Sequence, residues 1–231
     1  MIIPAHERVT YHEFLDSDSR SGLVPDRIYQ EQLLPFEQKM VNILDFGCGH
    51  GHVALLAAKL FERKPNISVY GCDYQEDLLD EFWSRVSLSK LKRVTPFFLP
   101  NISKIHLPAW LPPLHVICFS FSLSCVENFT DVLSSLKAKL LPDTTLIIID
   151  WQKDVKEAEL ENHFGRKNRI SYQDVLAALK ETGYTTELED NSNGSYFLLR
   201  ARNILWPGSN DKGCASAMFM SGARIWIYRS K

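Results

Sequence analysis

Long apolar runs are missing from this 231-residue sequence. No segment approaches the roughly twenty consecutive apolar residues of a membrane-spanning helix, and the N-terminus lacks the pattern of a signal peptide. The five cysteines form no C-x-x-C pair, so buried reduced thiols are the expected state. These absences together predict a cytoplasmic protein with no membrane span.

Strong charge and metal-binding spacing are missing as well. The formal net charge is -2, so no overall positive field predicts nucleic acid as a partner. The seven histidines form neither H-x-x-x-H nor H-E-x-x-H, and we therefore expect no metal site. The composition, with 45% hydrophobic and 23% charged residues, is typical of one globular domain with room for a cap or a tail.

The most informative stretch covers residues 42–53. A short apolar run turns through Gly47, Gly49 and Gly51 and continues directly into a good helix former. A buried strand, a glycine turn and a helix N-terminus form a nucleotide-binding corner, because glycine adopts positive φ and lets a ligand approach the backbone. The dinucleotide fingerprint G-x-G-x-x-G would need a third glycine at position 52, where this chain has His52.

An acidic residue, Asp45, lies two positions before the first glycine. It suits a ligand with a cationic amino-acid group better than one with a pyrophosphate, which it would repel. The pattern resembles motif I of the class I S-adenosylmethionine-dependent methyltransferases. The resemblance implies that S-adenosylmethionine is held by Asp45, Gly47, Cys48, Gly49 and Gly51.

Strand and helix patterns alternate along the chain. Strands are expected at about 41–46, 67–72, 94–99, 114–120 and 145–150, and helices at about 10–15, 25–34, 53–63, 74–89, 129–141 and 172–182. Segments 184–189 and 196–201 flank Asn191–Gly194 and predict a hairpin that adds an antiparallel edge strand. The order implies an α/β fold with a mostly parallel sheet and helices on both faces.

Polar side chains follow the expected strands where an open α/β sheet binds its ligand. Asp73 ends the second strand about twenty residues after the glycine turn, a place where an acid accepts hydrogen bonds from both hydroxyls of a ribose. Tyr74 can lie against the adenine ring or pack in the core. Ser120 and Phe121 end the fourth strand at the mouth of the sheet, or form simply its end and core.

The order of later motifs makes the resemblance more specific. Residues 114–128, the helix behind them and Leu146–Trp151 are similar to the second half of the type 11 methyltransferase domain, a group similar to the ubiquinone and menaquinone-biosynthesis C-methyltransferases. The resemblance covers roughly residues 19–202 and implies a Rossmann-like, seven-stranded sheet. Such enzymes place a polar side chain near the adenine amino group just beyond the third strand, where this chain has Asn101 and Ile102.

The chain departs from these relatives after the third strand. Relatives often carry Asp where this chain has His115, and a His pair or a His-acid pair where it has Ser124 and Cys125. These departures put in doubt a substrate role for those positions and leave the cofactor site untouched. The resemblance divides the chain into a helical cap at 1–40, a cofactor-binding domain at 41–202 and an extension of unknown role at 203–231.

Methyl transfer from a sulfonium is an in-line displacement, so the protein mainly aligns and desolvates the reactants. A general base depends on the acceptor, and the sequence contains no diagnostic catalytic pair. Candidates for the substrate side, in the cap or after the fifth strand, are Tyr11, His12, Asp150, His163 and Arg169. For each of them taken singly, a structural or solvent-facing role is the favoured alternative.

The sequence therefore predicts an S-adenosylmethionine-dependent methyltransferase acting on a small molecule. One alternative is an NAD-dependent oxidoreductase, against which position 52 and the terminal hairpin speak. The other is a non-catalytic module that binds S-adenosylmethionine. No feature of the sequence indicates the acceptor atom or an oligomeric state.

Overall fold

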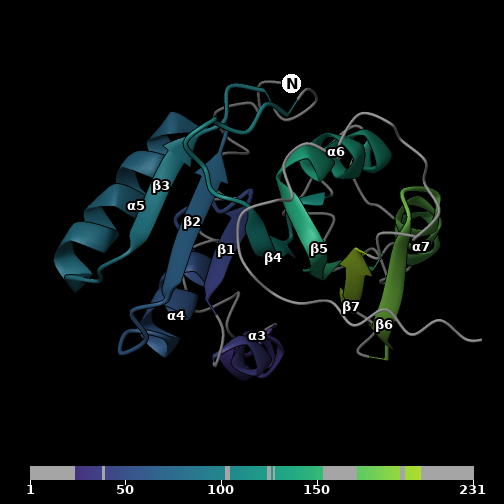
Figure 1. The fold of residues 1–231 in the computed structure, drawn as a ribbon, viewed down its shortest axis with the longest axis horizontal. Coiled ribbons are helices and arrows are strands. Elements are labelled where there is room, and N and C mark those ends of the chain that lie inside the picture. The colour runs from purple at the N-terminus through teal and green to yellow at the C-terminus, as the bar shows by residue number, and fades with distance from the viewer. Residues whose placement is uncertain are drawn as a thin grey trace, which may run out of the picture.

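The computed structural model describes residues 24–37, 40–101, 105–123, 126, 128–152, 171–192 and 196–203. They form one seven-stranded sheet in the order β3-β2-β1-β4-β5-β7-β6 (Figure 1). The strands are β1 (Val41–Phe46), β2 (Ile67–Asp73), β3 (Val94–Phe98), β4 (Leu114–Ser120), β5 (Leu140–Trp151), β6 (Tyr184–Asp190) and β7 (Tyr196–Asn203). The helices are α3 (Asp26–Leu33), α4 (His52–Leu60), α5 (Glu76–Ser89), α6 (Phe129–Leu136) and α7 (Tyr172–Glu181), with short 3-10 turns at Leu34–Phe36 and Lys137–Lys139.

The sheet is mostly parallel, as predicted. Strands β1 to β5 pair in parallel, whereas β7 pairs antiparallel with both β5 and β6. The predicted hairpin is confirmed, but its antiparallel strand is not the edge strand, because β7 lies between β5 and β6. The physical reason is burial: Tyr196–Leu199 are buried, whereas most of β6 after Tyr184 is partly or fully exposed.

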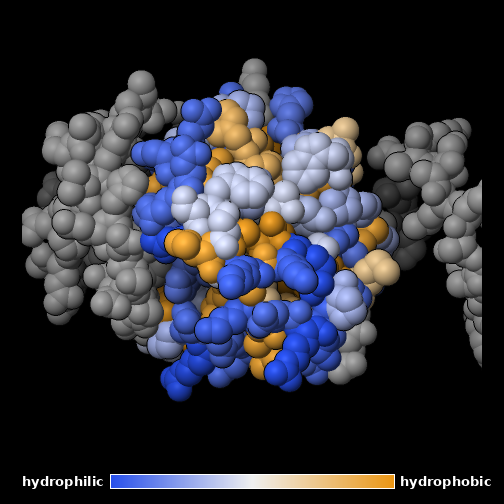
Figure 2. All heavy atoms as spheres, turned by 90° about the vertical axis from the view of Figure 1, so that its left-hand side faces the viewer, coloured by the Kyte–Doolittle hydropathy of each residue, from blue (hydrophilic) through white to orange (hydrophobic). Residues whose placement is uncertain are grey.

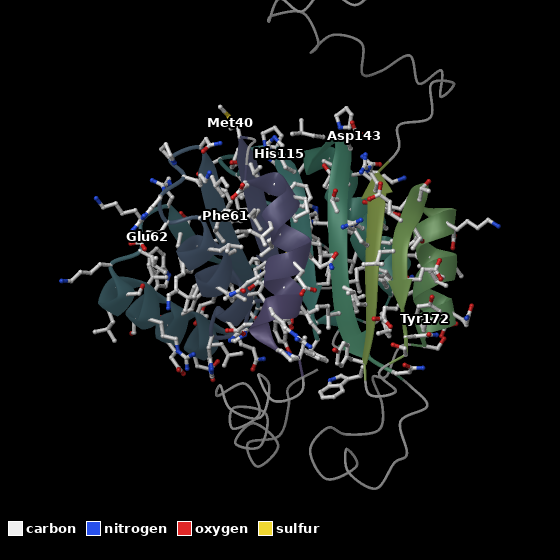
Figure 3. All side chains as sticks on the ribbon, turned by 90° about the horizontal axis from the view of Figure 1, so that it is seen from below. Met40, Phe61, Glu62, His115, Asp143 and Tyr172 are labelled. Carbon is white, nitrogen blue, oxygen red and sulfur yellow. The ribbon has the colours of Figure 1, made fainter. Side chains whose placement is uncertain are left out.

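Alternate side chains of each strand divide the core into two layers. Val41 and Ile43 of β1 pack in the layer with α3, α4 and α5, whereas Leu44 and Phe46 pack in the layer with α6 and α7. The predicted helices on both faces are therefore confirmed. In Figure 3, α3 is the purple helix that lies against the sheet. Asp45 belongs to the same row as Ile43 and so faces the layer that contains α4.

The β5 strand begins earlier than the sequence predicts. Leu140 already pairs with Leu114, and the register then shifts before Val116. Asp143 has φ 68°, and the Thr144 hydroxyl donates to the Leu114 carbonyl at 2.7 Å while accepting from Leu141 N at 2.8 Å. The expected turn at 142–143 is thus a local irregularity inside a paired strand. The predicted helix at 10–15 and the extension beyond residue 203 lie outside the described residues.

The edge at β3 carries exposed apolar side chains. Trp83, Leu88, Phe98 and Trp110 are 48%, 83%, 43% and 57% exposed. Figure 2 faces this side and shows hydrophobic residues set among hydrophilic ones. The Trp110 ring lies 5.3 Å from that of Phe97, so the link at 105–113 covers this end of the sheet on the α6 and α7 side.

The departure at position 115 lies far from the glycine turn. The His115 Nδ1 atom accepts a hydrogen bond from Asn42 N at 3.1 Å, where β1 and β4 begin. Figure 3 shows His115 near Met40 and Asp143, at the end of the sheet where the parallel strands start. Because ligands of open α/β sheets bind at the carboxyl ends of the strands, this histidine belongs to the framework.

Candidate active site

The turn after β1 is held by backbone hydrogen bonds. Gly47 N and Cys48 N both donate to the Cys72 carbonyl, at 2.9 and 3.0 Å. Gly51 N donates to the Cys48 carbonyl at 2.8 Å, and α4 begins immediately afterwards. The φ angles of Gly47, Gly49 and Gly51 are 68°, 52° and 80°, so all three occupy the left-handed region that favours glycine, as predicted.

Close packing is a second reason for two of these glycines. A Cβ at Gly47 would lie 2.5 Å from Ser122 Cβ, and one at Gly51 would lie 2.1 Å from the Phe82 ring. Both distances are too short for any side chain. The turn therefore fits against α5 on one side and against the end of β4 on the other.

The Asp73 carboxylate joins β2 to the glycine turn. Its Oδ2 accepts from Gly49 N at 2.8 Å and its Oδ1 accepts from Gln75 N at 3.0 Å. Burial raises the pKa of Asp73 above its ordinary value of 3.8, while the N–H groups of Gly49, Gln75 and Tyr74 act in the opposite direction. A carboxylate has about four acceptor positions, so these backbone contacts leave capacity for ligand hydroxyls.

Asp45 is placed at the start of α4. It is 2% exposed, and its Oδ2 accepts from Ala54 N at 3.0 Å, which satisfies one of the open N–H groups of the first helical turn. Burial, and next the negative charges of Asp45 and Asp73, raise the pKa of the Cys48 thiol. Cys48 is therefore held as a neutral thiol and is a poor nucleophile. Cys72 and Cys118 are likewise buried and free, and burial raises the pKa of each.

At the end of β4, two predicted residues are engaged by other elements. The Ser120 hydroxyl is hydrogen-bonded to the Tyr29 hydroxyl of α3 at 2.7 Å, and both residues are buried. Phe121 has φ 54°, and its ring centroid lies 4.6 Å from that of Trp151. Their side chains lie at the expected mouth of the sheet and pack within the layer that contains α3.

Asp150 was predicted as a substrate residue, and the structure buries it completely. Its Oδ2 accepts from Leu123 N and its Oδ1 accepts from Trp151 N, both at 2.8 Å. The carboxylate thus ties the segment after β4 to β5. This geometry favours a positioning role over contact with a substrate.

The remaining predicted residues divide into two groups. Tyr74 is half-buried directly after Asp73, and Asn101 is exposed just beyond β3, close to the point where Leu99 N bonds the Asp73 carbonyl at 2.8 Å. These two residues follow neighbouring strands at the same edge of the sheet. The others lie outside the described residues: Tyr11, His12, Ile102, His163 and Arg169.

Sequence reasoning missed the contacts between α3 and the turn. His52 Nε2 lies 3.0 Å from Asp26 Oδ1, and the His52 ring meets the Tyr29 ring edge-on at 6.2 Å. His52 stands where a dinucleotide fingerprint has its third glycine. It is the first residue of α4, and its contacts with Asp26 and Tyr29 connect this helix to α3. The replacement was visible in the sequence, but its partner was not.

Neither a metal centre nor a membrane helix occurs in the part of the chain that the structure describes. Among those residues, no group of three or more His, Cys, Asp or Glu could hold a metal ion. No helix there has the length and apolar character needed to cross a membrane.

A family described as "Methyltransferase domain" matches residues 13–189. The chain belongs to this methyltransferase family. It is also 31% identical over 179 residues to an uncharacterized protein of Haemophilus influenzae, a match that spans 66% of this chain and 66% of that one, just under two thirds of each. The predicted family, class I S-adenosylmethionine-dependent methyltransferases, is confirmed.

Solved structures share the fold of this methyltransferase. An S-adenosylmethionine-dependent methyltransferase from Aquifex aeolicus has a TM-score of 0.71 and 22% identity, covering 88% of this chain and 100% of that one. The plantazolicin methyltransferase BpumL in complex with S-adenosylhomocysteine has a TM-score of 0.63 and 15% identity, covering 87% and 91%. A putative type 11 methyltransferase from Sulfolobus solfataricus has a TM-score of 0.57 and 22% identity, covering 79% and 96%. Similarity to the ubiquinone-biosynthesis enzymes stays a prediction.

Proposed function

We propose that this protein transfers the methyl group of S-adenosylmethionine to a small-molecule acceptor. The observation that carries the proposal is the hydrogen bond from Gly49 N to Asp73 Oδ2 at 2.8 Å. It holds the glycine turn after β1 beside the acid that ends β2. The chain runs from β1 to β2 and β3 on one side and then crosses to β4 on the other, so β1 and β4 flank the switch point where open α/β sheets bind ligands.

The cofactor fits these residues end to end. Asp73 has acceptor capacity for the ribose hydroxyls, and Tyr74 and Asn101 follow the two strands nearest the expected adenine. Asp45 adds negative charge on the side where a cationic amino-acid group is favoured. When bound, S-adenosylmethionine supplies an electrophilic methyl group on a sulfonium.

The role of the protein is then alignment and exclusion of water. Among the described site residues, the Cys48 thiol has a raised pKa and Asp150 has both carboxylate oxygens bonded to backbone N–H groups. Neither residue is arranged as a nucleophile or a general base. We therefore assign the reaction to the positioning of the acceptor for in-line displacement.

A small molecule is the acceptor class that the composition favours. The formal net charge of -2 provides no general attraction to nucleic acid. Three described cysteines are free and buried, which accords with the cytoplasmic location we propose.

Binding is tested by calorimetric titration with S-adenosylhomocysteine and, separately, with NAD. We expect saturable binding of S-adenosylhomocysteine and none of NAD at the same concentrations. The variant Asp73→Ala should weaken the binding of S-adenosylhomocysteine. Its control is Asp80→Ala, which removes an exposed carboxylate on α5. Preference for NAD would contradict the proposed cofactor.

The acceptor class is tested with S-adenosylmethionine carrying a labelled methyl group, incubated with a whole-cell extract and the protein. We expect label to enter the filtered small-molecule fraction and not the protein or nucleic-acid fractions. Label in either macromolecular fraction would contradict a small-molecule acceptor. Cofactor binding without label transfer to any fraction would favour the non-catalytic alternative.

A further inference from the structure

Basic side chains gather at the end of the sheet opposite the candidate active site. They lie on residues 59–64 and 90–93, where α4 and α5 end and where β2 and β3 begin. The cations of these two segments are Lys59, Arg63, Lys64, Lys90, Lys92 and Arg93. Glu62 is the one carboxylate within the same segments. A chain with a formal net charge of -2 therefore concentrates positive charge on one surface.

Arg93 holds the two basic segments together. Its side chain donates to the carbonyls of Ile67, Glu62 and Lys64 at 3.0, 3.2 and 2.9 Å. The chain leaves α5 through Lys90 and enters β3 directly after Arg93, and both residues have positive φ. Because Arg93 bonds backbone carbonyls and no carboxylate, it joins the segments without neutralising their charge.

The other cations of the two segments have no carboxylate partner. Within the part of the chain that the structure describes, no ion pair involves Lys59, Arg63, Lys64, Lys90 or Lys92. Lys59 lies in the last turn of α4 and Lys90 is the C-cap of α5, where a cation is favoured by the helix dipole. Arg63, Lys64 and Lys92 lie outside the helices, so the dipole does not account for them.

Two apolar side chains protrude beside the cations. Leu88, in the last turn of α5, is 83% exposed. Met40 is 73% exposed directly before β1, at the end of the sheet where the strands start (Figure 3). The next residue, Val41, donates its N–H to the Asn66 carbonyl at 3.0 Å, which places Met40 near the loop that follows α4. Exposed apolar groups among unpaired cations are typical of an interaction surface.

An anionic lipid surface fits both properties. Lys and Arg are attracted to negative headgroups, and protruding apolar side chains enter the layer beneath them. We propose that residues 59–64 and 90–93 with Met40 and Leu88, the basic surface, bind anionic phospholipid bilayers. Nucleic acid would match only the charges, because its phosphate backbone has no apolar layer to receive Leu88. The proposal does not depend on methyl transfer, and a bilayer bound there leaves the opposite end of the sheet open to cofactor and acceptor.

Cosedimentation of the full chain with vesicles tests the proposal. Vesicles of phosphatidylcholine alone are compared with vesicles of phosphatidylcholine and phosphatidylserine in equal parts. We expect binding to the second kind only, weakening as salt is added, because salt screens exposed charges. The double variant Lys59→Glu with Lys90→Glu should bind anionic vesicles more than about tenfold less tightly, since each cation near the surface contributes about fivefold.

The matched control is Lys180→Glu with Lys137→Glu on the other face of the sheet. Lys180 lies in the last turn of α7 and Lys137 is the C-cap of α6, so the control reverses equal charge at equivalent helix positions. It should bind anionic vesicles as the wild-type protein does. Both double variants weaken the helix dipole interaction, and a Tm measurement therefore separates that loss of stability from the loss of binding.

Leu88→Ser distinguishes a bilayer from nucleic acid. It should weaken binding to anionic vesicles by about fivefold or more, because an inserted apolar side chain is lost. Wild-type protein should bind a DNA duplex more weakly than anionic vesicles at the same salt concentration. The proposal is overturned if the wild-type protein binds neither kind of vesicle or both equally. Equal loss of binding in the two double variants, unchanged vesicle binding by Leu88→Ser, or tighter binding to the duplex would overturn it as well.

Discussion

The two halves of the candidate site are held together in different ways. On the β1–β2 side, the backbone of the glycine turn bonds the neighbouring strand, and Gly49 N reaches Asp73. On the β4–β5 side, the hydrogen bonds come from side chains far apart in the sequence. The Tyr29 hydroxyl is hydrogen-bonded to the Ser120 hydroxyl, and the Asp150 carboxylate accepts from Leu123 N. The first half depends on backbone conformation together with the Asp73 carboxylate, whereas the second depends on buried side-chain hydrogen bonds.

This difference explains why only one half has a recognisable motif. Left-handed backbone and close packing restrict a position to glycine, so the requirement is written in the residue type. A buried hydroxyl or carboxylate that bonds a backbone N–H can be supplied from several elements, so no fixed spacing marks it. Five predictions test this contrast, and they are ordered from the largest expected effect to the smallest.

Gly51→Ala should destabilise the β1–β2 side most. The new Cβ would lie 2.1 Å from the Phe82 ring and would add a side chain at φ 80°. We expect a loss of about 2–4 kcal/mol in the free energy of unfolding, measured by chemical denaturation. Gly183→Ala is the matched control, because that glycine has the same φ of 80° but its nearest neighbour is 3.9 Å away. Equal losses in the two variants would show that packing against Phe82 is unimportant.

Asp150→Asn should break the β4–β5 side. The carboxylate accepts one hydrogen bond from Leu123 N and one from Trp151 N. The NH2 group of asparagine would face one of these two N–H donors, and that donor would lose its acceptor inside the core. We expect this to cost about 1–3 kcal/mol in the free energy of unfolding. Asp143→Asn, at an exposed position that asparagine tolerates at positive φ, should be close to neutral in the same denaturation assay.

Asp73→Ala should weaken S-adenosylmethionine binding by more than tenfold, which corresponds to about 1.4 kcal/mol or more of lost ribose hydrogen bonding. Calorimetry measures the affinity, and circular dichroism checks that the fold is kept. Unchanged affinity in a folded variant would remove Asp73 from the cofactor site.

The Asp73 carboxyl group should make both the stability of the protein and its ligand affinity depend on pH. Burial raises the pKa of Asp73 in the folded protein above 3.8. As the pH falls through that raised pKa, the folded protein takes up the proton before the unfolded chain does, so the contribution of Asp73 to stability increases. Affinity for S-adenosylhomocysteine should decrease over the same pH range, because a neutral carboxyl is a poorer acceptor. Asp73→Asn should lack both pH dependences when titrated and denatured alongside the wild-type protein.

Tyr29→Phe should produce the smallest effect. It keeps the buried ring and its contact with His52 but removes the 2.7 Å hydrogen bond to Ser120. We expect a loss of about 1 kcal/mol in the free energy of unfolding. Tyr172→Phe, which removes an exposed hydroxyl bonded to Glu189, should cost less. A larger loss for Tyr172 than for Tyr29 would reverse the assigned order of the two contacts.

The sequence alone determined the strand, glycine turn and helix at 41–60 and the acid that ends β2. These features follow from local rules: the periodicity of apolar residues, the conformational freedom of glycine and the position of polar residues at strand ends. The order of strand and helix patterns also predicted the mostly parallel sheet, since crossover connections favour that arrangement.

Only the tertiary structure decided how the other half of the site is built. It placed β7 inside the edge of the sheet, buried Asp150 against the segment after β4, joined Tyr29 to Ser120 and left the Ser122 hydroxyl facing Gly47. Each of these outcomes depends on contacts between residues far apart in the chain. No local periodicity or propensity encodes such a contact, because its energy exists only once both partners have been brought together.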